Sequence, residues 1–251
     1  MFPQRKIFRR GIFAVGAVIA FAVFLLAFLM ARSRYEKQLT AKIWPVTTPE
    51  VFAHVSLSDR SAPTVLLLGD SRMAQWDLPP LPGWRVVNAG MNGLTTGELR
   101  RGAPKVLDDF QPAVVVLQAG INDLKFIGLH PERAAEIVSL AADNLNTVVR
   151  ECVARHCRVI VLKTWPTQTP SLLRQLVWSA KISAAVDQLN TKLESLNSPS
   201  DGIRVVDLFR EARIKLSPES YRDTLHFKPE TYQQLTPALA LALEATSFPA
   251  K

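Results

Sequence analysis

The sequence contains few of the residues that bind transition metals, with two cysteines and four histidines among 251 residues. Cys152, His156 and Cys157 lie close together, but a tetrahedral zinc site requires a fourth ligand that this cluster lacks. The two cysteines leave two interpretations open: a short local disulfide in an oxidising compartment, or two free thiols near a helix end. Nothing in the sequence implies a metal ion or an organic cofactor, and we expect none.

Charge is absent from one long segment. Residues 11–31 consist only of Gly, Ala, Val, Ile, Leu, Phe and Met, and at about 1.5 Å per residue a helix of this length crosses a hydrocarbon core of roughly 30 Å. The alternative, a cleaved signal peptide, usually has an apolar region of about 7 to 15 residues followed by a small-x-small cleavage site. Leu29-Met30-Ala31 places a bulky residue there, and the residues after Arg9-Arg10 fit a twin-arginine signal poorly. The segment therefore predicts an uncleaved transmembrane signal anchor.

Basic residues lie mostly before this segment. Those before it are Arg5, Lys6, Arg9 and Arg10, whereas Arg32, Arg34 and Lys37 after it are offset by Glu36. Because positive residues flank membrane helices on the cytoplasmic side, the N-terminus is predicted to be cytoplasmic. The rest of the chain is then expected on the extracytoplasmic side, which we take to be the periplasm.

The overall charge is strongly basic, at +8 with a pI near 9.8. Residues 1–37 account for +6 of this charge and residues 38–251 for only +2. The basicity therefore belongs mainly to the membrane flanks, and we expect no nucleic-acid partner.

The chain divides into four predicted parts. A basic cytoplasmic tail covers residues 1–10 and the membrane helix covers residues 11–31. Residues 32–62 are polar and contain prolines without a sustained period, which favours a stalk or linker. Residues 63–251 are enough for one domain with a sizeable core, and no internal repeat is visible.

Apolar runs alternate with amphipathic stretches in this domain. The runs are residues 64–68, 85–87, 113–117, 158–162 and 203–206. Continuous apolar runs are typical of strands buried on both faces of a parallel sheet. We therefore expect an α/β fold, a three-layer α/β/α sandwich around a mostly parallel five-stranded sheet with right-handed crossovers.

Helix signals occupy the intervening stretches. Thr95 and Glu98 form a predicted capping box, and Pro131 suits the first turn of a helix that ends near Arg150. Apolar residues recur at helical spacing from Leu173 to Leu193, which predicts one continuous helix there, and a last helix is expected from about Pro229.

Four short blocks stand in order along the domain: Gly69-Asp70-Ser71, Asn88-Ala89-Gly90, Gly120-Ile121-Asn122-Asp123 and Asp223-Thr224-Leu225-His226. The first three follow predicted strands, whose carboxyl ends form the ligand-binding edge of such sheets. In this order the blocks resemble the SGNH (GDSL-type) hydrolase family, over about residues 64–245. The resemblance implies a flavodoxin-like fold and a serine esterase.

The resemblance also implies a role for each block. Ser71 would be the nucleophile and His226 its base, oriented by Asp223. The Gly90 backbone N–H and the Asn122 side-chain amide would stabilise the oxyanion, helped by the Ser71 N–H. The other histidines, His54, His130 and His156, have no aspartate three residues before them, and the Gly-x-Ser-x-Gly elbow of α/β-hydrolases is absent.

Several residues leave alternatives open. Arg72 either meets an anionic part of the substrate, or is solvated or paired with Asp70 or Asp77. Asp123 is expected to support its loop without a catalytic role. Three of the five tryptophans either stack on a sugar or line an acyl pocket, or pack in the core, which is the default; the three are Trp76, Trp165 and Trp178.

The function predicted from these features is cleavage of carboxylic esters, with O-acyl or O-acetyl groups foremost. The ester could belong to a small molecule, a glycan or a lipid. One alternative is an O-acetyltransferase acting on cell-envelope polysaccharide, in which a sugar hydroxyl replaces water. Another is a non-catalytic carbohydrate-binding or scaffold protein of the same fold, although such a protein does not need a nucleophile and a base. The sequence leaves the oligomeric state open.

Overall fold

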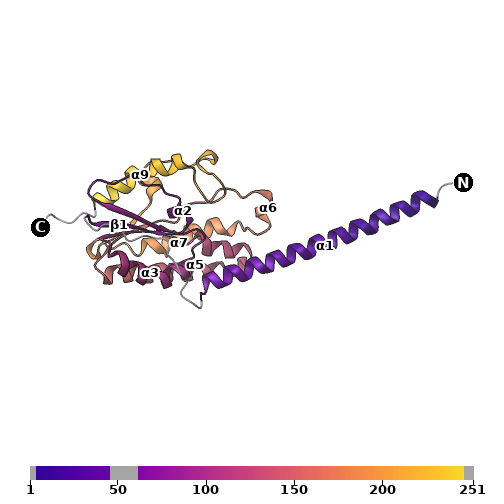
Figure 1. Ribbon diagram of the computed structural model, residues 1–251, viewed down its shortest axis with the longest axis horizontal. Helices are drawn as coiled ribbons and strands as arrows, with labels where there is room; N and C mark the ends of the chain where they lie inside the picture. The colour runs from indigo at the N-terminus through magenta and orange to yellow at the C-terminus, as the bar shows by residue number, and fades with distance from the viewer. Residues whose placement is uncertain (1–3, 46–61, 246–251) are drawn as a thin grey trace. The chain divides into compact units, whose positions relative to one another are not determined.

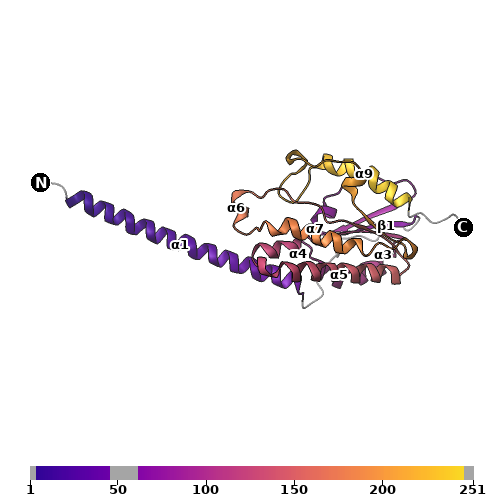
Figure 2. The same ribbon diagram turned by 180° about the vertical axis from the view of Figure 1, so that it is seen from behind.

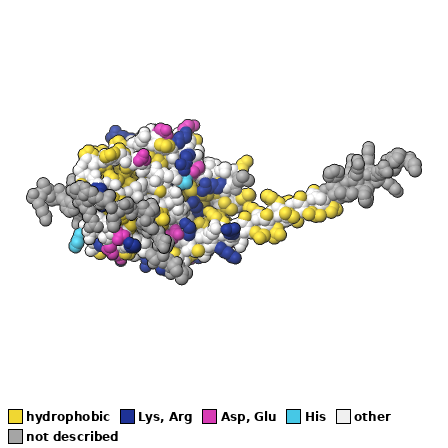
Figure 3. Space-filling model, viewed as in Figure 1, with side chains coloured by type: hydrophobic (Ala, Val, Ile, Leu, Met, Phe, Trp, Pro, Cys, Tyr) yellow, Lys and Arg dark blue, Asp and Glu magenta, His cyan; other side chains and the backbone are white. Residues whose placement is uncertain are grey.

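The N-terminal part of the chain is one long helix. The computed structural model describes residues 4–45 and 62–245, and α1 runs over Gln4–Ile43 (Figure 1). Within it, Val15–Ile43 is long and apolar enough to cross a membrane, with a mean hydropathy of 2.4 in its most apolar window. Hydrophobic side chains cover the surface of this stretch (Figure 3). Val18, Phe21 and Phe24 are among those that are exposed. A helix with such a surface requires an apolar environment, a property that a signal sequence shares.

The helix is longer than the predicted span. It continues through residues 32–43, which the sequence assigned to the linker, and the rest of that linker from 46 to 61 lies outside the described residues. The chain divides into two compact units, one ending at Leu39 and one beginning at Thr40. The globular unit thus begins well before the boundary expected at residue 63.

The globular unit is built on the five-stranded parallel sheet that the sequence predicts. Its strands are β1 Thr64–Gly69, β2 Arg85–Gly90, β3 Val114–Gln118, β4 Arg158–Leu162 and β5 Ile203–Val206. Their order is β2-β1-β3-β4-β5. At the carboxyl edge Gly69 pairs with both Gly90 and Gln118, so the segments that follow β1, β2 and β3 leave the sheet side by side.

Helices cover both faces of the sheet. α3 Thr96–Phe110, α5 Ala134–Ala154 and α7 Lys181–Glu194 lie on one side and α9 Pro229–Glu244 on the other (Figures 1 and 2). Short helices follow strands or lie in loops: α2 Ser71–Ala74, α4 Ile121–Leu124, α6 Leu172–Gln175 and α8 Leu208–Glu211. Single 3-10 turns occur at Lys125–Gly128, Pro131–Arg133, Pro199–Asp201 and Pro218–Ser220. The α/β/α expectation is confirmed.

The core explains why the strands are apolar throughout. Val65 and Leu67 of β1 pack in one cluster with Leu235 and Leu239 of α9. Alternate strand residues point to opposite faces, so Leu66, which is also fully buried, faces the opposite helical layer. A strand with helices on both faces cannot alternate apolar with polar residues.

One helix prediction needs adjustment. The Thr95 capping box is present as expected, but the helix predicted from Leu173 to Leu193 is divided into α6 and α7. Leu172 and Leu176 are exposed, whereas Ile182 and Leu189 of α7 are buried. The helical spacing of apolar residues continues across the break between α6 and α7, but of these two helices it is α7 whose apolar residues are buried in the core.

The cysteines are not joined. Cys152 in α5 and Cys157 after it are both buried free thiols, which excludes the disulfide interpretation for this structure. Burial raises the pKa of both thiols.

Candidate active site

Ser71 lies at the carboxyl end of β1 as the first residue of α2. Asp70 caps this short helix, because its Oδ1 accepts a hydrogen bond from the Arg72 backbone N–H at 2.9 Å. The cap fixes the backbone on both sides of the serine. Burial raises the pKa of the fully enclosed Asp70 carboxyl, against the opposing charge of Arg72.

Ser71, His226 and Asp223 form one hydrogen-bonded chain. The Ser71 Oγ lies 2.8 Å from His226 Nε2, and His226 Nδ1 lies 2.7 Å from Asp223 Oδ2. When the carboxylate accepts the Nδ1 proton, Nε2 is left as the acceptor for the serine hydroxyl. The chain becomes less exposed toward the serine, since the side chains of Asp223 and His226 are 40% and 19% exposed and Ser71 is buried.

Asp223 is held in its ionised form. Burial opposes ionisation, but hydrogen bonds from the Leu225 and His226 backbone N–H groups and from the imidazole outweigh it and lower the Asp223 pKa to about 2. One carboxylate oxygen therefore accepts the two backbone bonds and the other faces the ring. This arrangement orients the imidazole and stabilises its protonated form.

Arg72 does not have either of the roles expected from the sequence. Its guanidinium is completely buried and donates to three backbone carbonyls: those of Leu225 at 3.0 Å, Trp165 at 2.6 Å and Pro166 at 3.1 Å. Burial lowers the Arg72 pKa and the nearby Asp70 opposes that shift. Arg72 therefore ties the loop that carries His226 to the segment after β4, in a position that solvent does not reach.

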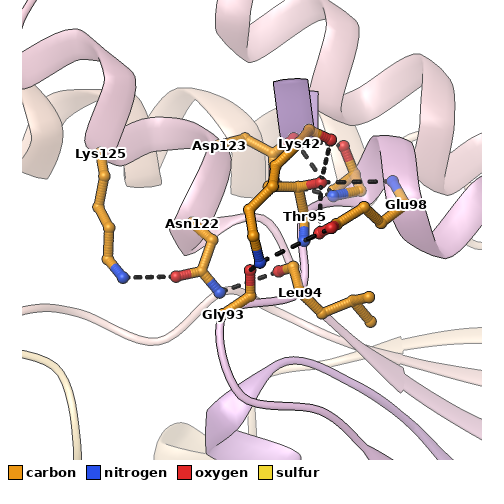
Figure 4. A network of polar contacts seen from close by, with 9 residues as sticks. Lys42, Gly93, Leu94, Thr95, Glu98, Asn122, Asp123 and Lys125 are labelled. Carbon is orange, nitrogen blue, oxygen red and sulfur yellow. Dashed lines mark hydrogen bonds and ion pairs between the residues drawn. The ribbon is translucent and has the colours of Figure 1, made fainter. Parts of the chain in front are cut away.

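Asn122 lies in α4, shortly after β3. Its amide oxygen and one of its two amide hydrogens are already hydrogen-bonded within the protein. Its Nδ2 donates to the Leu94 carbonyl at 2.9 Å and its Oδ1 accepts from Lys125 Nζ at 2.5 Å (Figure 4). The second Nδ2 hydrogen has no acceptor among the described residues. An amide held in this way can present one N–H to an incoming oxygen.

Gly90 differs from its expected role. Its backbone N–H donates to Asn88 Oδ1 at 2.9 Å, so it is not available to a substrate oxygen in this conformation. A Cβ at Gly90 would collide with the Ala74 backbone. Glycine is therefore required at this position because β2 packs closely against α2 there.

The turn after β2 offers another backbone donor. The Met91 N–H is donated to Gly69 and the Leu94 N–H to Met91, while the N–H groups of Asn92 and Gly93 have no acceptor among the described residues. Gly93 has a φ of +74° and lies next to Leu94, which Asn122 binds. The sequence signal that was missed is this second glycine, three residues after Gly90.

Asp123, expected to support its own loop, lies in α4 and contacts the neighbouring helix α3. Its carboxylate accepts from the Thr96 backbone N–H at 2.9 Å and from Thr96 Oγ1 at 2.7 Å. Desolvation in this enclosed position raises the Asp123 pKa to about 7, although the Thr96 hydrogen bonds oppose the shift. The contact joins the start of α3 to α4 beside Asn122.

The remaining candidates that the structure describes are not members of this hydrogen-bonded chain. His54 is outside the described residues, and His130 pairs with Glu132 and stacks on Phe126. Trp76 and Trp165 are buried in the core cluster, in accordance with the default for tryptophan. Trp178 is half-buried and has the Arg174 guanidinium over its ring.

Comparison with known proteins identifies the family. Residues 67–234 match the model of the GDSL-like lipase/acylhydrolase family. No curated protein shows significant sequence similarity to the chain.

Solved structures show the same fold at low sequence identity. A GDSL-like lipase from Bacteroides thetaiotaomicron is 17% identical, with a TM-score of 0.59 over 86% of this chain and 98% of that one. The aryl esterase of M. smegmatis is 16% identical, with a TM-score of 0.58 over 74% and 100%. A carbohydrate acetylesterase family member from Sinorhizobium meliloti is 18% identical, with a TM-score of 0.53 over 73% and 98%. With the family model matched over most of its globular unit, the chain belongs to the GDSL-like lipase/acylhydrolase family, the SGNH hydrolases.

Proposed function

We propose that this protein is a membrane-anchored serine hydrolase that cleaves carboxylic esters through an acyl-enzyme on Ser71. The observation that carries the proposal is the continuous hydrogen-bonded chain from Ser71 Oγ through His226 to Asp223. Membership of an acylhydrolase family supports the same reaction class. A binding module has no use for a serine aligned with a base.

The reaction follows from this chain. His226 Nε2 takes the Ser71 proton as Oγ attacks the ester carbonyl carbon, and Asp223 stabilises the imidazolium. The tetrahedral intermediate collapses, the bond to the alcohol oxygen breaks, and His226 returns the proton to the leaving alcohol. Water then attacks the acyl-enzyme by the same proton path, which releases the carboxylic acid and restores Ser71.

The developing oxyanion needs donors close to Ser71. We propose the Ser71 backbone N–H, the remaining Asn122 amide N–H and the Gly93 backbone N–H. Gly93 replaces Gly90 in this proposal because the Gly90 N–H is already donated to Asn88. The hydrogen bond from Asn122 to Leu94 supports this choice, since it brings the amide beside the turn that contains Gly93.

For the membrane topology we propose a cytoplasmic N-terminus and an extracytoplasmic domain. The charge-free residues 11–31 and the basic residues before them support this orientation. A reporter fused after Lys251 is expected to be active only outside the cytoplasm, with the protein retained in membranes after a high-salt wash. A shortened, soluble product would instead identify a cleaved signal sequence.

The deciding experiment uses the full-length protein in detergent. It measures release of p-nitrophenol from esters of increasing acyl length, with Ser71→Ala as the control, and labelling by a fluorophosphonate probe. Hydrolysis that depends on Ser71 supports the esterase, and product that requires an added oligosaccharide acceptor identifies a transferase instead. A wild-type protein that neither reacts with the probe nor turns over any ester would overturn the proposal in favour of a binding module.

A further inference from the structure

The last turn of α1 is part of the globular unit. Ile43 is 2% exposed, and its carbonyl oxygen occupies the space that a Cβ at Gly97 would need. The next residue, Trp44, meets the Phe126 ring edge-on at 5.7 Å and has the Arg133 guanidinium 4.9 Å from its own ring centroid. These contacts fix the segment from Thr40 to Trp44 on the elements that surround the candidate oxyanion site.

Lys42 extends from this turn to the segment after β2. Its Nζ donates to the Gly93 carbonyl at 3.0 Å and lies 3.6 Å from Glu98 Oε1 (Figure 4). Its own carbonyl accepts a hydrogen bond from Thr95 Oγ1 at 2.6 Å. Lys42 therefore holds both Gly93 and the first residues of α3 from one position.

Gly93 is a backbone position that needs such restraint. Its φ of +74° lies in a region that glycine enters freely, and glycine also leaves it freely because no Cβ limits its rotation. In the structure the carbonyl of Gly93 is held by Lys42 and the carbonyl of the next residue, Leu94, by Asn122. The two contacts fix the two peptide groups that follow the Gly93 Cα, and so restrain the backbone directly after the N–H that we assign to the oxyanion.

We propose that Lys42 is a positioning residue for ester cleavage, coupling the last turn of α1 to the oxyanion side of the active site. The inference rests on the proposed function and adds to it a residue outside the four sequence blocks. Lys42 acts through Gly93 and does not contact the substrate. Its loss should therefore change transition-state stabilisation more than substrate binding.

The ion pair with Glu98 alone does not explain the position. The Lys42 side chain is 42% exposed, and a partly exposed pair at 3.6 Å contributes little to stability. The distinguishing contact is the hydrogen bond to the Gly93 carbonyl, which an arginine could also donate. An apolar side chain could not donate this hydrogen bond, and a shorter charged side chain could not reach the Gly93 carbonyl.

The test compares full-length variants in detergent: Lys42→Met, Lys42→Arg, and Lys37→Met as an exposed lysine of the same helix. Fluorophosphonate labelling taken to completion counts the active sites, and turnover per labelled site is then measured. We expect Lys42→Met to lower kcat about tenfold with KM changed by less than about twofold, since a positioning defect costs less than loss of a donor. Lys42→Arg should recover part of the loss, and Lys37→Met should match wild type.

A double-mutant cycle tests the route of the effect. If Lys42 acts through the turn that Asn122 binds, Lys42→Met should cost clearly less in an Asn122→Ala background than in wild type. Full additivity would overturn this route.

Other outcomes separate the two proposals. Fewer labelled sites with normal kcat per site, a change in KM alone, or normal activity of Lys42→Met would each overturn the positioning role while leaving the hydrolase intact. A wild-type protein that is neither labelled nor active would overturn the proposed function and the role of Lys42 with it.

Discussion

Lys125 Nζ donates to Asn122 Oδ1 at 2.5 Å, so the amide of Asn122 is held with its oxygen toward Lys125 and its nitrogen toward the Leu94 carbonyl. With the amide turned the other way, the Asn122 NH₂ group would face the Lys125 ammonium, and two hydrogen-bond donors would meet without an acceptor. The lysine is largely buried, and desolvation, followed by the charge of Arg174, lowers its pKa to about 8. The hydrogen-bond donor that fixes the candidate oxyanion amide therefore changes charge just above neutral pH.

The first prediction concerns the pH dependence of turnover. Above about pH 8 the Lys125 ammonium loses its proton and holds Asn122 less firmly, so wild-type kcat should fall on the alkaline side. Lys125→Arg stays protonated and should extend the active range upward, whereas Lys125→Met should have low kcat without this alkaline transition. Steady-state kcat from pH 6 to 10 measures the effect, and an identical alkaline transition in Lys125→Met would contradict it.

Lys125 should also make stability depend on pH in a definite direction. Its pKa is about 8 in the folded protein and 10.5 ordinarily, so between these values the unfolded chain binds more protons. The free energy of unfolding should therefore rise with pH across this window, relative to Lys125→Met. Thermal unfolding of both proteins at pH 7.5 and 10 compares them. A wild-type Tm that falls against the variant over this interval would show that the folded lysine is not desolvated.

Ser71 and His226 are predicted to act as one unit. Ser71→Ala and His226→Ala should each lower kcat by about 10³-fold or more, and the double variant should lose little beyond either. Asp223→Asn should also be impaired, because it removes the carboxylate that accepts the Nδ1 proton. Normal turnover by Ser71→Ala would refute the nucleophile assignment.

The two glycines after β2 should respond differently to alanine. Gly90→Ala should fold poorly, because the added Cβ meets the Ala74 backbone, whereas at Gly93 the added Cβ has Lys42 Nζ at 3.5 Å. Gly93→Ala strains a positive φ and should lower kcat, as Asn122→Ala should by about a hundredfold. Expression and Tm separate a folding defect from a kinetic one. A well-folded Gly90→Ala with kcat reduced like Asn122→Ala would restore Gly90 as the donor.

The sheet and the block order were predictable because both depend on local patterns. Apolar runs such as residues 64–68 predicted β1 within one residue, and the glycine-containing block after it placed Ser71 at the sheet edge. Parallel pairing then brings the segments after neighbouring strands together. The approach of His226 to Ser71 followed only from the family resemblance, because 155 residues separate them.

The contacts around the site were not predictable because they depend on tertiary packing. An arginine after a serine gives no sign that its guanidinium is buried against three carbonyls, as that of Arg72 is. Lys42 lies in a stretch whose prolines and polar residues indicated a linker. Only the structure shows that this stretch begins as the end of α1 and contacts Gly93.

Arg72 provides the last prediction. Arg72→Met would remove the buried donor from the carbonyls of Leu225, Trp165 and Pro166, and the positive charge that favours ionisation of Asp70. We expect a loss of about 3 kcal/mol or more in the free energy of unfolding. A lysine side chain carries its charge on one nitrogen that cannot reach all three carbonyls, so Arg72→Lys should fall between methionine and wild type.

The kinetic consequence separates a positioning role from a purely structural one. Below the Tm of the variant, turnover per fluorophosphonate-labelled site should still be reduced, because the Leu225 carbonyl that Arg72 binds is adjacent to His226. Arg210→Met, at an exposed arginine, is the matched control and should leave both Tm and turnover near wild type. The contrary result is that Arg72→Met lowers the Tm while each labelled site turns over at the wild-type rate. That result would show that Arg72 stabilises the fold without orienting His226, because the loop would then keep the imidazole within reach of Ser71 without the arginine.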